Sequence, residues 1–369
     1  MLLIKPYLGC NLACKYCYEG IYRTKHKPGK EYNLEAILKR MEEFKDFDMA
    51  LHGGEILCLP QKDVEKMLAK MYELKGKSSI QTNATLINDK WIEIFKKYKT
   101  SVGVSWDGPD ELSKYRPGSS RVGSIIERLV KEGLSVSIII VLSKANAGTK
   151  TRLNKLKKYL LRLNQLKISG RLNPCIDVPN CELKLDNLKK VYLDLADFCL
   201  KNNLRKWSPF IDIINGLQNK DRVCILMGCD PFSTKSAMVV LNDGSITNCM
   251  RTNKEGILIR HPAQYKTRNE ILANVPQEYN GCQGCKYWTA CFGGCPSSAI
   301  DNDWRNRTYL CPIWKALFEF HENILGYCGA SINICQKPEE RPKETERGDK
   351  YGDAPHGDAP HGDHTDKIF

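Results

Sequence analysis

The stretch GCNLACKYCYEG, residues 9–20, places three cysteines within eight positions, at the spacing C-x3-C-x2-C. Structural zinc sites and four-iron clusters are normally closed by four protein ligands. Three thiolates from Cys10, Cys14 and Cys17 therefore leave one metal position open to a substrate or cofactor. From the spacing alone, the alternative is a zinc site that takes a fourth ligand such as His26 or Cys58.

The cysteine content of the whole chain also favours metal binding. The 369 residues include 17 cysteines, an odd number that a purely disulfide-bonded framework does not predict. The sequence begins without the basic and apolar segments of a signal peptide, and no apolar run is long enough to span a membrane. We therefore expect a cytoplasmic protein whose clustered cysteines bind metal.

The formal net charge of +13 has two interpretations. A nucleic-acid partner is one of them. Basic stretches such as KLKKYLLR, residues 155–162, instead place lysines at helical spacing beside leucines, which is typical of a solvated helix face. We therefore favour scattered surface lysines, with attraction to an acidic peptide or an anionic cofactor, over nucleic-acid binding.

Residues 1–210 alternate short apolar runs with amphipathic helical patterns, which predicts about six β-α units. Such units favour an α/β fold with a parallel sheet closed or part-closed into a barrel, here a partial (β/α)6 TIM-like barrel. We expect strands within 2–8, 48–55, 78–86, 100–109, 135–143 and 166–178, and helices at 34–44, 63–76, 89–98, 124–133 and 153–164.

Two regions of different composition follow. Residues 211–335 are rich in cysteine and glycine and show a helical pattern only at 313–325, which predicts a small domain stapled by metal. Residues 336–369 contain DAPHG twice in tandem and few apolar residues, which predicts a disordered tail. The repeat looks like a peptide substrate attached for modification in cis, but a solvated tail is the favoured interpretation.

Four polar motifs stand where predicted strands end: GCNLAC, HGGE, QTN and SWDGP. In barrels of parallel strands, the chemistry lies where strands exit into loops. With HGGE at 52–55, the cysteine triplet resembles the radical S-adenosylmethionine (SAM) superfamily. In that family the open iron of a [4Fe-4S] cluster binds SAM, and an electron from the cluster splits SAM to a 5′-deoxyadenosyl radical that abstracts hydrogen from the substrate.

The resemblance implies a set of SAM contacts. Tyr16 matches the aromatic position that contacts adenine, and the glycine backbone with the Glu55 carboxylate would accept hydrogen bonds from the SAM ammonium group. Ile56 departs from the family, which usually has proline there. For Asn83 and Arg116, ordinary turn polar groups are an equally good explanation. The residues assigned to SAM are Tyr16, Gly53, Gly54, Glu55, Asn83, Ser105 and Arg116.

A second cysteine set resembles the SPASM domain of peptide- and protein-modifying radical SAM enzymes. Its pattern runs through Cys229, Gly244, Cys249, Cys282, Cys285, Cys291, Cys295 and Cys311. The resemblance implies two auxiliary [4Fe-4S] clusters, the first held by Cys224, Cys229, Cys249 and Cys295, the second by Cys282, Cys285, Cys291 and Cys311. If Cys224 is not a ligand, the first cluster keeps an open iron. Two structural zincs are the alternative for the whole domain.

The predicted activity is peptide maturation, in which hydrogen abstraction is followed by oxidation to a crosslink, a thioether or a similar product. Met250 stands where sulfatase maturases carry an aspartate base, which argues against that activity. The general base is not identified, although His52 and Tyr18 are near in sequence. Expected partners are a peptide, recognised by a separate leader-binding protein or directly by the barrel, and a reductant such as flavodoxin or ferredoxin. The alternatives are a radical SAM epimerase or dehydrogenase and an iron-sulfur electron carrier.

Overall fold

One sheet of eight strands organises the chain, in the order β6-β5-β4-β3-β2-β1-β7-β8. All neighbouring strands run parallel except β7 and β8, which are antiparallel. The prediction of six parallel β-α units is confirmed. The strands are β1 (Leu2–Ile4), β2 (Met49–Leu51), β3 (Ser78–Thr82), β4 (Thr100–Ser105), β5 (Val136–Leu142), β6 (Ser169–Pro174), β7 (Met238–Val240) and β8 (Ile246–Asn248).

This computed structural model describes residues 1–20, 31–220, 229, 238–249 and 267–327. These residues belong to one unit, Met1–Ile334. Four features of the sequence predictions lie outside the described residues: His26, Cys224, Met250 and the tail at 336–369.

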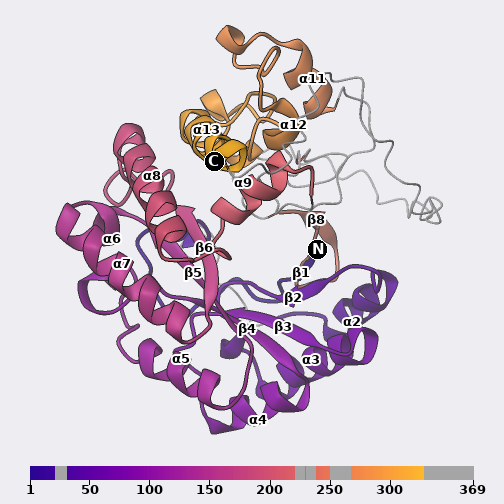
Figure 1. The fold of residues 1–369 in the computed structure, drawn as a ribbon. Helices are drawn as coiled ribbons and strands as arrows, with labels where there is room; N and C mark the ends of the chain where they lie inside the picture. The colour runs from indigo at the N-terminus through magenta and orange to yellow at the C-terminus, as the bar shows by residue number, and fades with distance from the viewer. Residues whose placement is uncertain (21–30, 221–228, 230–237, 250–266, 328–369) are drawn as a thin grey trace. The chain divides into compact units, whose positions relative to one another are not determined.

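Helices follow the strands and cover one face of the sheet, and Figure 1 shows α3, α4, α5 and α7 around its outer side. The helices are α2 (Leu34–Glu43), α3 (Gln61–Lys75), α4 (Asp89–Lys97), α5 (Val122–Lys131), α6 (Lys144–Ala147), α7 (Lys150–Gln165), α8 (Leu185–Lys201), α9 (Phe210–Leu217), α11 (Arg268–Asn274), α12 (Trp288–Cys291) and α13 (Cys311–Tyr327). Asn33, Asn88 and Thr149 accept a backbone N–H at the starts of α2, α4 and α7, which satisfies a donor that the helix leaves open.

The alternation of side chains along the strands separates an outer face from an inner face. On β5, Ile138, Ile140 and Leu142 are buried against the helices. Between them, Ile139 and Val141 are only partly buried and face the other way. The inner face of the sheet is therefore open to side chains from loops and to ligands.

Helix α7 explains the basic stretch 155–162. Leu153, Leu156, Leu160 and Leu163 recur at helical spacing and are buried. Lys155 lies on the opposite side, half exposed, and pairs with Glu111. Lys155 thus lies on the solvent face of an amphipathic helix, as the spacing predicts.

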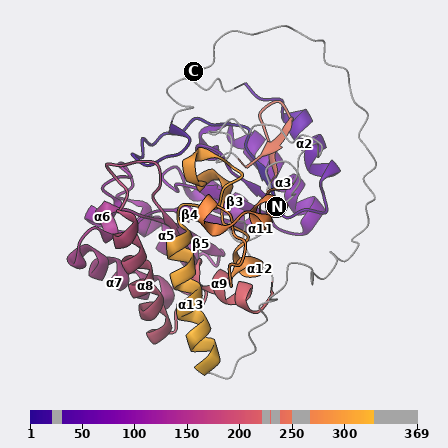
Figure 2. The ribbon, with the colours of Figure 1, turned by 90° about the horizontal axis from the view of Figure 1, so that it is seen from above.

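Residues beyond 210 contribute to the same sheet, which their composition does not suggest. Strand β7 pairs in parallel with β1, Leu3 lying beside Val239, and β8 returns antiparallel to β7. Figure 2 shows α13 beside α8 and α9, and it packs against both. The helix predicted at 313–325 is confirmed within α13. Among the described helices, none is both long and apolar enough to cross a membrane.

We predict that Leu156→Ala will lower the free energy of unfolding by about 2 to 5 kcal/mol, because it leaves a cavity in a packed interface. Lys155→Ala, on the exposed side of the same helix turn, should change it by less than about 1 kcal/mol. Urea unfolding followed by circular dichroism measures both. Equal losses for the two variants would contradict this assignment of the helix faces.

Candidate active site

The cysteine triplet lies on the loop that follows β1. All three thiols are half-buried. The Cys17 N–H donates to the Cys14 carbonyl at 3.2 Å, and Lys15 N–H donates to the Tyr115 carbonyl at 2.9 Å. These bonds close the loop on itself and attach it to the segment after β4.

Nitrogen donors point at two of the three sulfurs. Leu12 N–H lies 3.3 Å from Cys10 Sγ, and Asn83 Nδ2 lies 3.7 Å from the same sulfur. Arg116 Nη1 lies 3.6 Å from Cys14 Sγ. N–H groups directed at sulfur suit thiolates that ligate iron and tune the potential of a cluster. The triplet therefore fits a [4Fe-4S] cluster in the chemistry of its donors.

The surroundings of Cys14 change the pKa of its thiol. Burial raises its pKa to about 11, while the positive Arg116 guanidinium acts in the opposite direction. Metal coordination deprotonates a thiol outright. Arg116 is thus placed to stabilise the thiolate that a bound metal requires.

The two glycines of HGGE are needed for close backbone packing. The N–H of Gly54 donates to the Tyr7 carbonyl at 3.0 Å, and the N–H of Glu55 donates to the Gly9 carbonyl at 2.8 Å. A Cβ on Gly54 would lie 2.0 Å from the Gly9 oxygen, and one on Gly53 would lie 2.3 Å from the Tyr7 oxygen. Gly53 also has φ +153°, which favours glycine. These glycines hold the start of the cysteine loop against the end of β2.

Glu55 is fully buried and ties two strand ends together. Its Oε1 accepts from Thr82 Oγ1 at 2.7 Å and from the Leu57 N–H at 3.1 Å, and its Oε2 accepts from the Asn83 N–H at 2.7 Å. Burial raises its pKa, and these bonds oppose the rise. A carboxylate has about four acceptor positions, so one remains for a ligand donor. The predicted contact of Glu55 with the SAM ammonium group stays a prediction.

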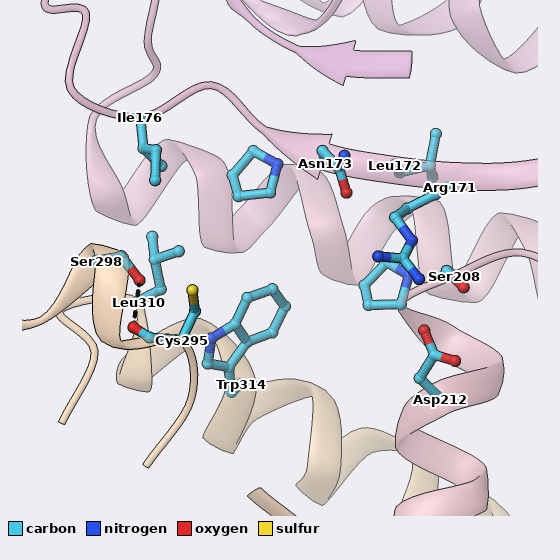
Figure 3. A pocket seen from close by; sticks show the side chains of 12 residues that line it. Arg171, Leu172, Asn173, Ile176, Ser208, Asp212, Cys295, Ser298, Leu310 and Trp314 are labelled. Atoms are coloured by element: carbon cyan, nitrogen blue, oxygen red, sulfur yellow. Dashed lines mark hydrogen bonds between the residues drawn. The ribbon is translucent and has the colours of Figure 1, made fainter. Parts of the chain in front are cut away.

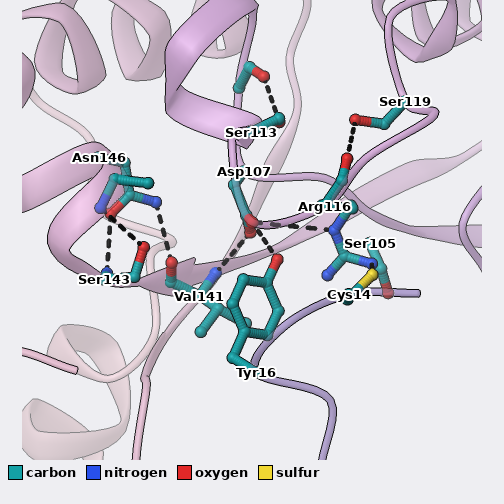
Figure 4. A network of polar contacts seen from close by, with 12 residues as sticks. Cys14, Tyr16, Ser105, Asp107, Ser113, Arg116, Ser119, Val141, Ser143 and Asn146 are labelled. Carbon is teal, nitrogen blue, oxygen red and sulfur yellow. Dashed lines mark hydrogen bonds and ion pairs between the residues drawn. The ribbon is translucent and has the colours of Figure 1, made fainter. Parts of the chain in front are cut away.

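Figure 4 shows a buried network that joins Tyr16, Asp107 and Arg116. Asp107 Oδ2 accepts from the Tyr16 hydroxyl, and Oδ1 accepts from the Val141 N–H at 2.9 Å. Arg116 Nε lies 3.8 Å from Asp107 Oδ2, and its guanidinium carbon lies 5.5 Å from the Tyr16 ring centre. Tyr16 and Arg116 are predicted SAM contacts, whereas Asp107, which joins them, is not among the predicted residues. Its only sequence signal was its position in SWDGP, which also reads as a turn.

Ser105 lies on the inner face at the end of β4. Its hydroxyl accepts from Gln81 Nε2 at 2.7 Å, and it pairs across the sheet with Ile139. Asn83 Nδ2 donates to Asn11 Oδ1 at 2.9 Å as well as to Cys10 Sγ, and both acceptors belong to the cysteine loop. The structure thus brings these two predicted SAM contacts to neighbouring strand ends, with Asn83 beside Cys10. Their contact with SAM stays a prediction.

His52 is a weak base, because its ring binds a proton poorly in this environment. Its Nδ1 accepts the Gly53 N–H at 2.8 Å. Loss of hydration around the ring, with the Lys5 ammonium nearby, lowers the pKa of His52 to about 3. Lys5 itself is buried, paired with Glu19 at 2.7 Å and donating to the Tyr18 hydroxyl at 3.2 Å. His52 and Tyr18 therefore belong to the packing beneath the cysteine loop.

A family model described as the Radical SAM superfamily matches residues 4–147, which hold the cysteine loop and all the groups above. The chain contains a radical SAM domain. The cysteine-type anaerobic sulfatase-maturating enzyme of Clostridium perfringens (strain 13 / Type A) is 26% identical over 362 residues, which cover 86% of this chain and 95% of that enzyme.

Two solved structures share the fold of this radical SAM enzyme. "Native anSMEcpe with bound AdoMet and Cp18Cys peptide" superposes with a TM-score of 0.67 at 24% identity, covering 89% of this chain and 98% of that one. Streptococcus suis SuiB bound to precursor peptide SuiA superposes with a TM-score of 0.55 at 18% identity, covering 84% of this chain and 75% of that one. At these identities, the likeness shows a common fold.

The radical SAM enzyme also brings together four cysteines of the second set. Burial raises the pKa of Cys282 to about 12, and the neighbouring thiols of Cys285 and Cys311 add to the rise. Cys291 is influenced by the same three thiols. These four are the residues that the resemblance assigned to one auxiliary cluster. Within the described ranges, no three Cys, His, Asp or Glu side chains converge as ligands of a single ion. Each cysteine of a [4Fe-4S] cluster binds a different iron.

Arg268 lies among the cysteines, fully buried at the start of α11. Its three guanidinium nitrogens donate to five backbone carbonyls, those of Phe292, Gly293, Gly294, Trp304 and Asn306, at 2.7 to 3.3 Å. The thiols that act on its charge include Cys229 and Cys295. Arg268 therefore fixes the turn at 292–294 and places a positive charge where thiolates gather. Cys249 follows β8 directly and is half-buried.

We predict that Asp107→Asn in this radical SAM enzyme will reduce the free energy of unfolding by about 3 kcal/mol. The substitution leaves the buried Arg116 charge without its carboxylate, which is costly in a buried pair. Asp303→Asn is the matched control, because Asp303 pairs with Arg305 at the surface, and it should cost less than about 1 kcal/mol. Urea unfolding measures both, and a loss for Asp107→Asn no larger than the control would refute the structural importance of the network.

Proposed function

We propose that this radical SAM enzyme is a peptide maturase, with a SPASM domain at 211–335 that holds two auxiliary [4Fe-4S] clusters. The observation that carries the proposal is the cysteine triplet, held by the Gly-Gly-Glu segment and supplied with N–H donors at Cys10 and Cys14. Support for a peptide substrate comes from relatives: one is named for sulfatase maturation, and two solved neighbours contain bound peptides.

The cluster at the triplet would supply an electron that splits SAM and so generates the 5′-deoxyadenosyl radical. The residues of the chain would hold both components. Cys10, Cys14 and Cys17 would ligate three irons and leave the fourth for the SAM amine and carboxylate. Arg116 and Asn83 would donate to the sulfurs, which stabilises negative charge on the cluster.

The SAM contacts in this proposal come from neighbouring strand ends. Glu55, with one acceptor position remaining, would bind the ammonium group, and the Ser105 hydroxyl would bind the carboxylate or ribose. Tyr16 would contact adenine. The Asp107 carboxylate and the Arg116 guanidinium hold the Tyr16 ring in place, which orients this ring before SAM binds.

The product would be an oxidised peptide, with a crosslink, a thioether or a similar modification, after an auxiliary cluster accepts an electron. Met250 argues against sulfatase maturation, because the resemblance places it where those enzymes carry an aspartate base. A reductant such as flavodoxin or ferredoxin, a leader-binding protein and a cytoplasmic location complete the proposal. The alternatives are an epimerase or dehydrogenase acting on another substrate, and an electron carrier that does not cleave SAM.

Release of 5′-deoxyadenosine from SAM by dithionite-reduced protein tests the proposal. Anaerobically reconstituted wild type should contain iron rather than zinc, about twelve irons per chain for three clusters, and should form 5′-deoxyadenosine. Cys14→Ala should lose about four irons per chain and reduce 5′-deoxyadenosine formation at least a hundredfold, because it removes a ligand of the SAM-binding cluster.

Cys199→Ala is the matched control. Cys199 is a buried cysteine of α8, packed in the core away from both cysteine sets, and its loss should leave iron content and SAM cleavage unchanged. Iron-loaded wild type that released no 5′-deoxyadenosine would favour the electron carrier. Zinc in place of iron in protein assembled anaerobically would refute the cluster assignments.

A further inference from the structure

A narrow cavity lies where the end of β6 meets the cysteine-rich region (Figure 3). Arg171 and Asn173 of β6 line it, together with Asp212 at the start of α9. Cys295 and Trp314 contribute the facing wall. The enclosed space is about 20 Å³, so it admits the polar edge of a planar group but not a whole side chain. None of the contacts assigned to SAM or to the cysteine triplet involves this cavity.

Asp212 is an incompletely satisfied buried acid. Asp212 is 4% exposed, and its Oδ2 has no hydrogen-bond partner among the residues that the structure describes. Burial raises its pKa, while the Ser208 hydroxyl and the Arg171 charge act to lower it. A buried carboxylate oxygen without a donor is costly, so a donor from outside the chain would be favoured there. A first-turn acid also stabilises the helix that it begins, and this is the competing explanation.

Arg171 provides the complementary group. Figure 3 shows the Asp212 carboxylate turned toward the Arg171 guanidinium and Ser208. The backbone explains this arrangement, since Arg171 pairs with Ser208 as a short parallel bridge. The cavity therefore offers one acceptor and one strong donor side by side. The N–H and the carbonyl of one extended peptide residue present the matching pair on the same side of the backbone.

The cavity shares the inner face of the sheet with the predicted SAM contacts. Ser105 pairs with Ile139, and Ile139 pairs with Arg171, so the three side chains point to the same side. Two strand spacings separate the Ser105 and Arg171 backbones by about 10 Å. A group held at Asp212 thus lies on the same side of the sheet as the region where SAM is expected, about three extended residues away.

We propose that this cavity is a substrate subsite that binds the backbone of one peptide residue, with Asp212 Oδ2 accepting its N–H and Arg171 donating to its carbonyl. The inference rests on the proposed peptide maturase function and adds where the peptide is held. Because an amide is common to all residues, the subsite anchors the peptide without reading its sequence. Asp212 and Arg171 are positioning residues for the substrate.

The test measures peptide affinity of the anaerobically reconstituted, SAM-loaded full chain. The probe is the Cp18Cys peptide, fluorescently labelled and followed by anisotropy, with N-acetylglycinamide at millimolar concentration as a small amide competitor. Asp212→Leu and Arg171→Met should each weaken binding at least tenfold, and the competitor should displace the peptide from wild type. Asp194→Leu, which changes a partly exposed acid of α8, should bind as wild type does.

Thermal unfolding separates the two explanations of Asp212. Removal of a buried, unsatisfied carboxylate should leave the melting temperature of Asp212→Leu unchanged or higher. A lowered melting temperature with unchanged peptide affinity would show that the acid only stabilises α9, and unchanged affinity alone would show that the cavity holds water. Wild type that bound neither probe but released 5′-deoxyadenosine would overturn the subsite and leave the radical SAM activity standing. Binding lost in Asp212→Leu, with no SAM cleavage by wild type, would support the subsite and refute the radical SAM activity.

Discussion

The backbone contact between Gly54 and the Tyr7–Gly9 segment determines where the chemistry can take place. Two hydrogen bonds cross this contact, and a single added carbon would lie 2.0 Å from a carbonyl oxygen. The cysteine loop begins at its far side, and Glu55 continues from its near side. Because Glu55 is fixed to the end of β3 by two hydrogen bonds, the loop, β2 and β3 form one rigid unit. This unit would therefore determine the position of a bound cluster.

Buried charge then fixes the loop from two directions. Lys5 and Glu19 pair at 2.7 Å beneath it, with side chains 1% and 3% exposed. Arg116 and Asp107 pair on the side of β4, also buried. Buried pairs give little net stability, since desolvation offsets their attraction, but each is satisfied in only one arrangement. The arginine pair also faces the sulfur of Cys14, so it contributes to orientation and to the electrostatics of the thiolate.

The sequence predicted the six parallel strands because each unit shows its own periodicity. It predicted the glycine pair but attributed it to SAM access, whereas the structure shows that backbone packing already requires it. Strand β7 was missed because three apolar residues in a region rich in cysteine and glycine carry too little signal. The cavity could not be predicted either, since Arg171 and Asp212 meet only through the bridge between Arg171 and Ser208.

The inner face itself indicates which polar groups belong to the scaffold and which await a ligand. Gln81 donates to the Ser105 oxygen, so that oxygen is satisfied while the hydroxyl hydrogen remains available to an acceptor such as a carboxylate. Asp212 presents the opposite case, an acceptor without a donor. A donor therefore waits at β4 and an acceptor beyond β6, on the same side of one sheet. This polarity suits an anionic group of a cofactor at the first position and an N–H of a substrate at the second.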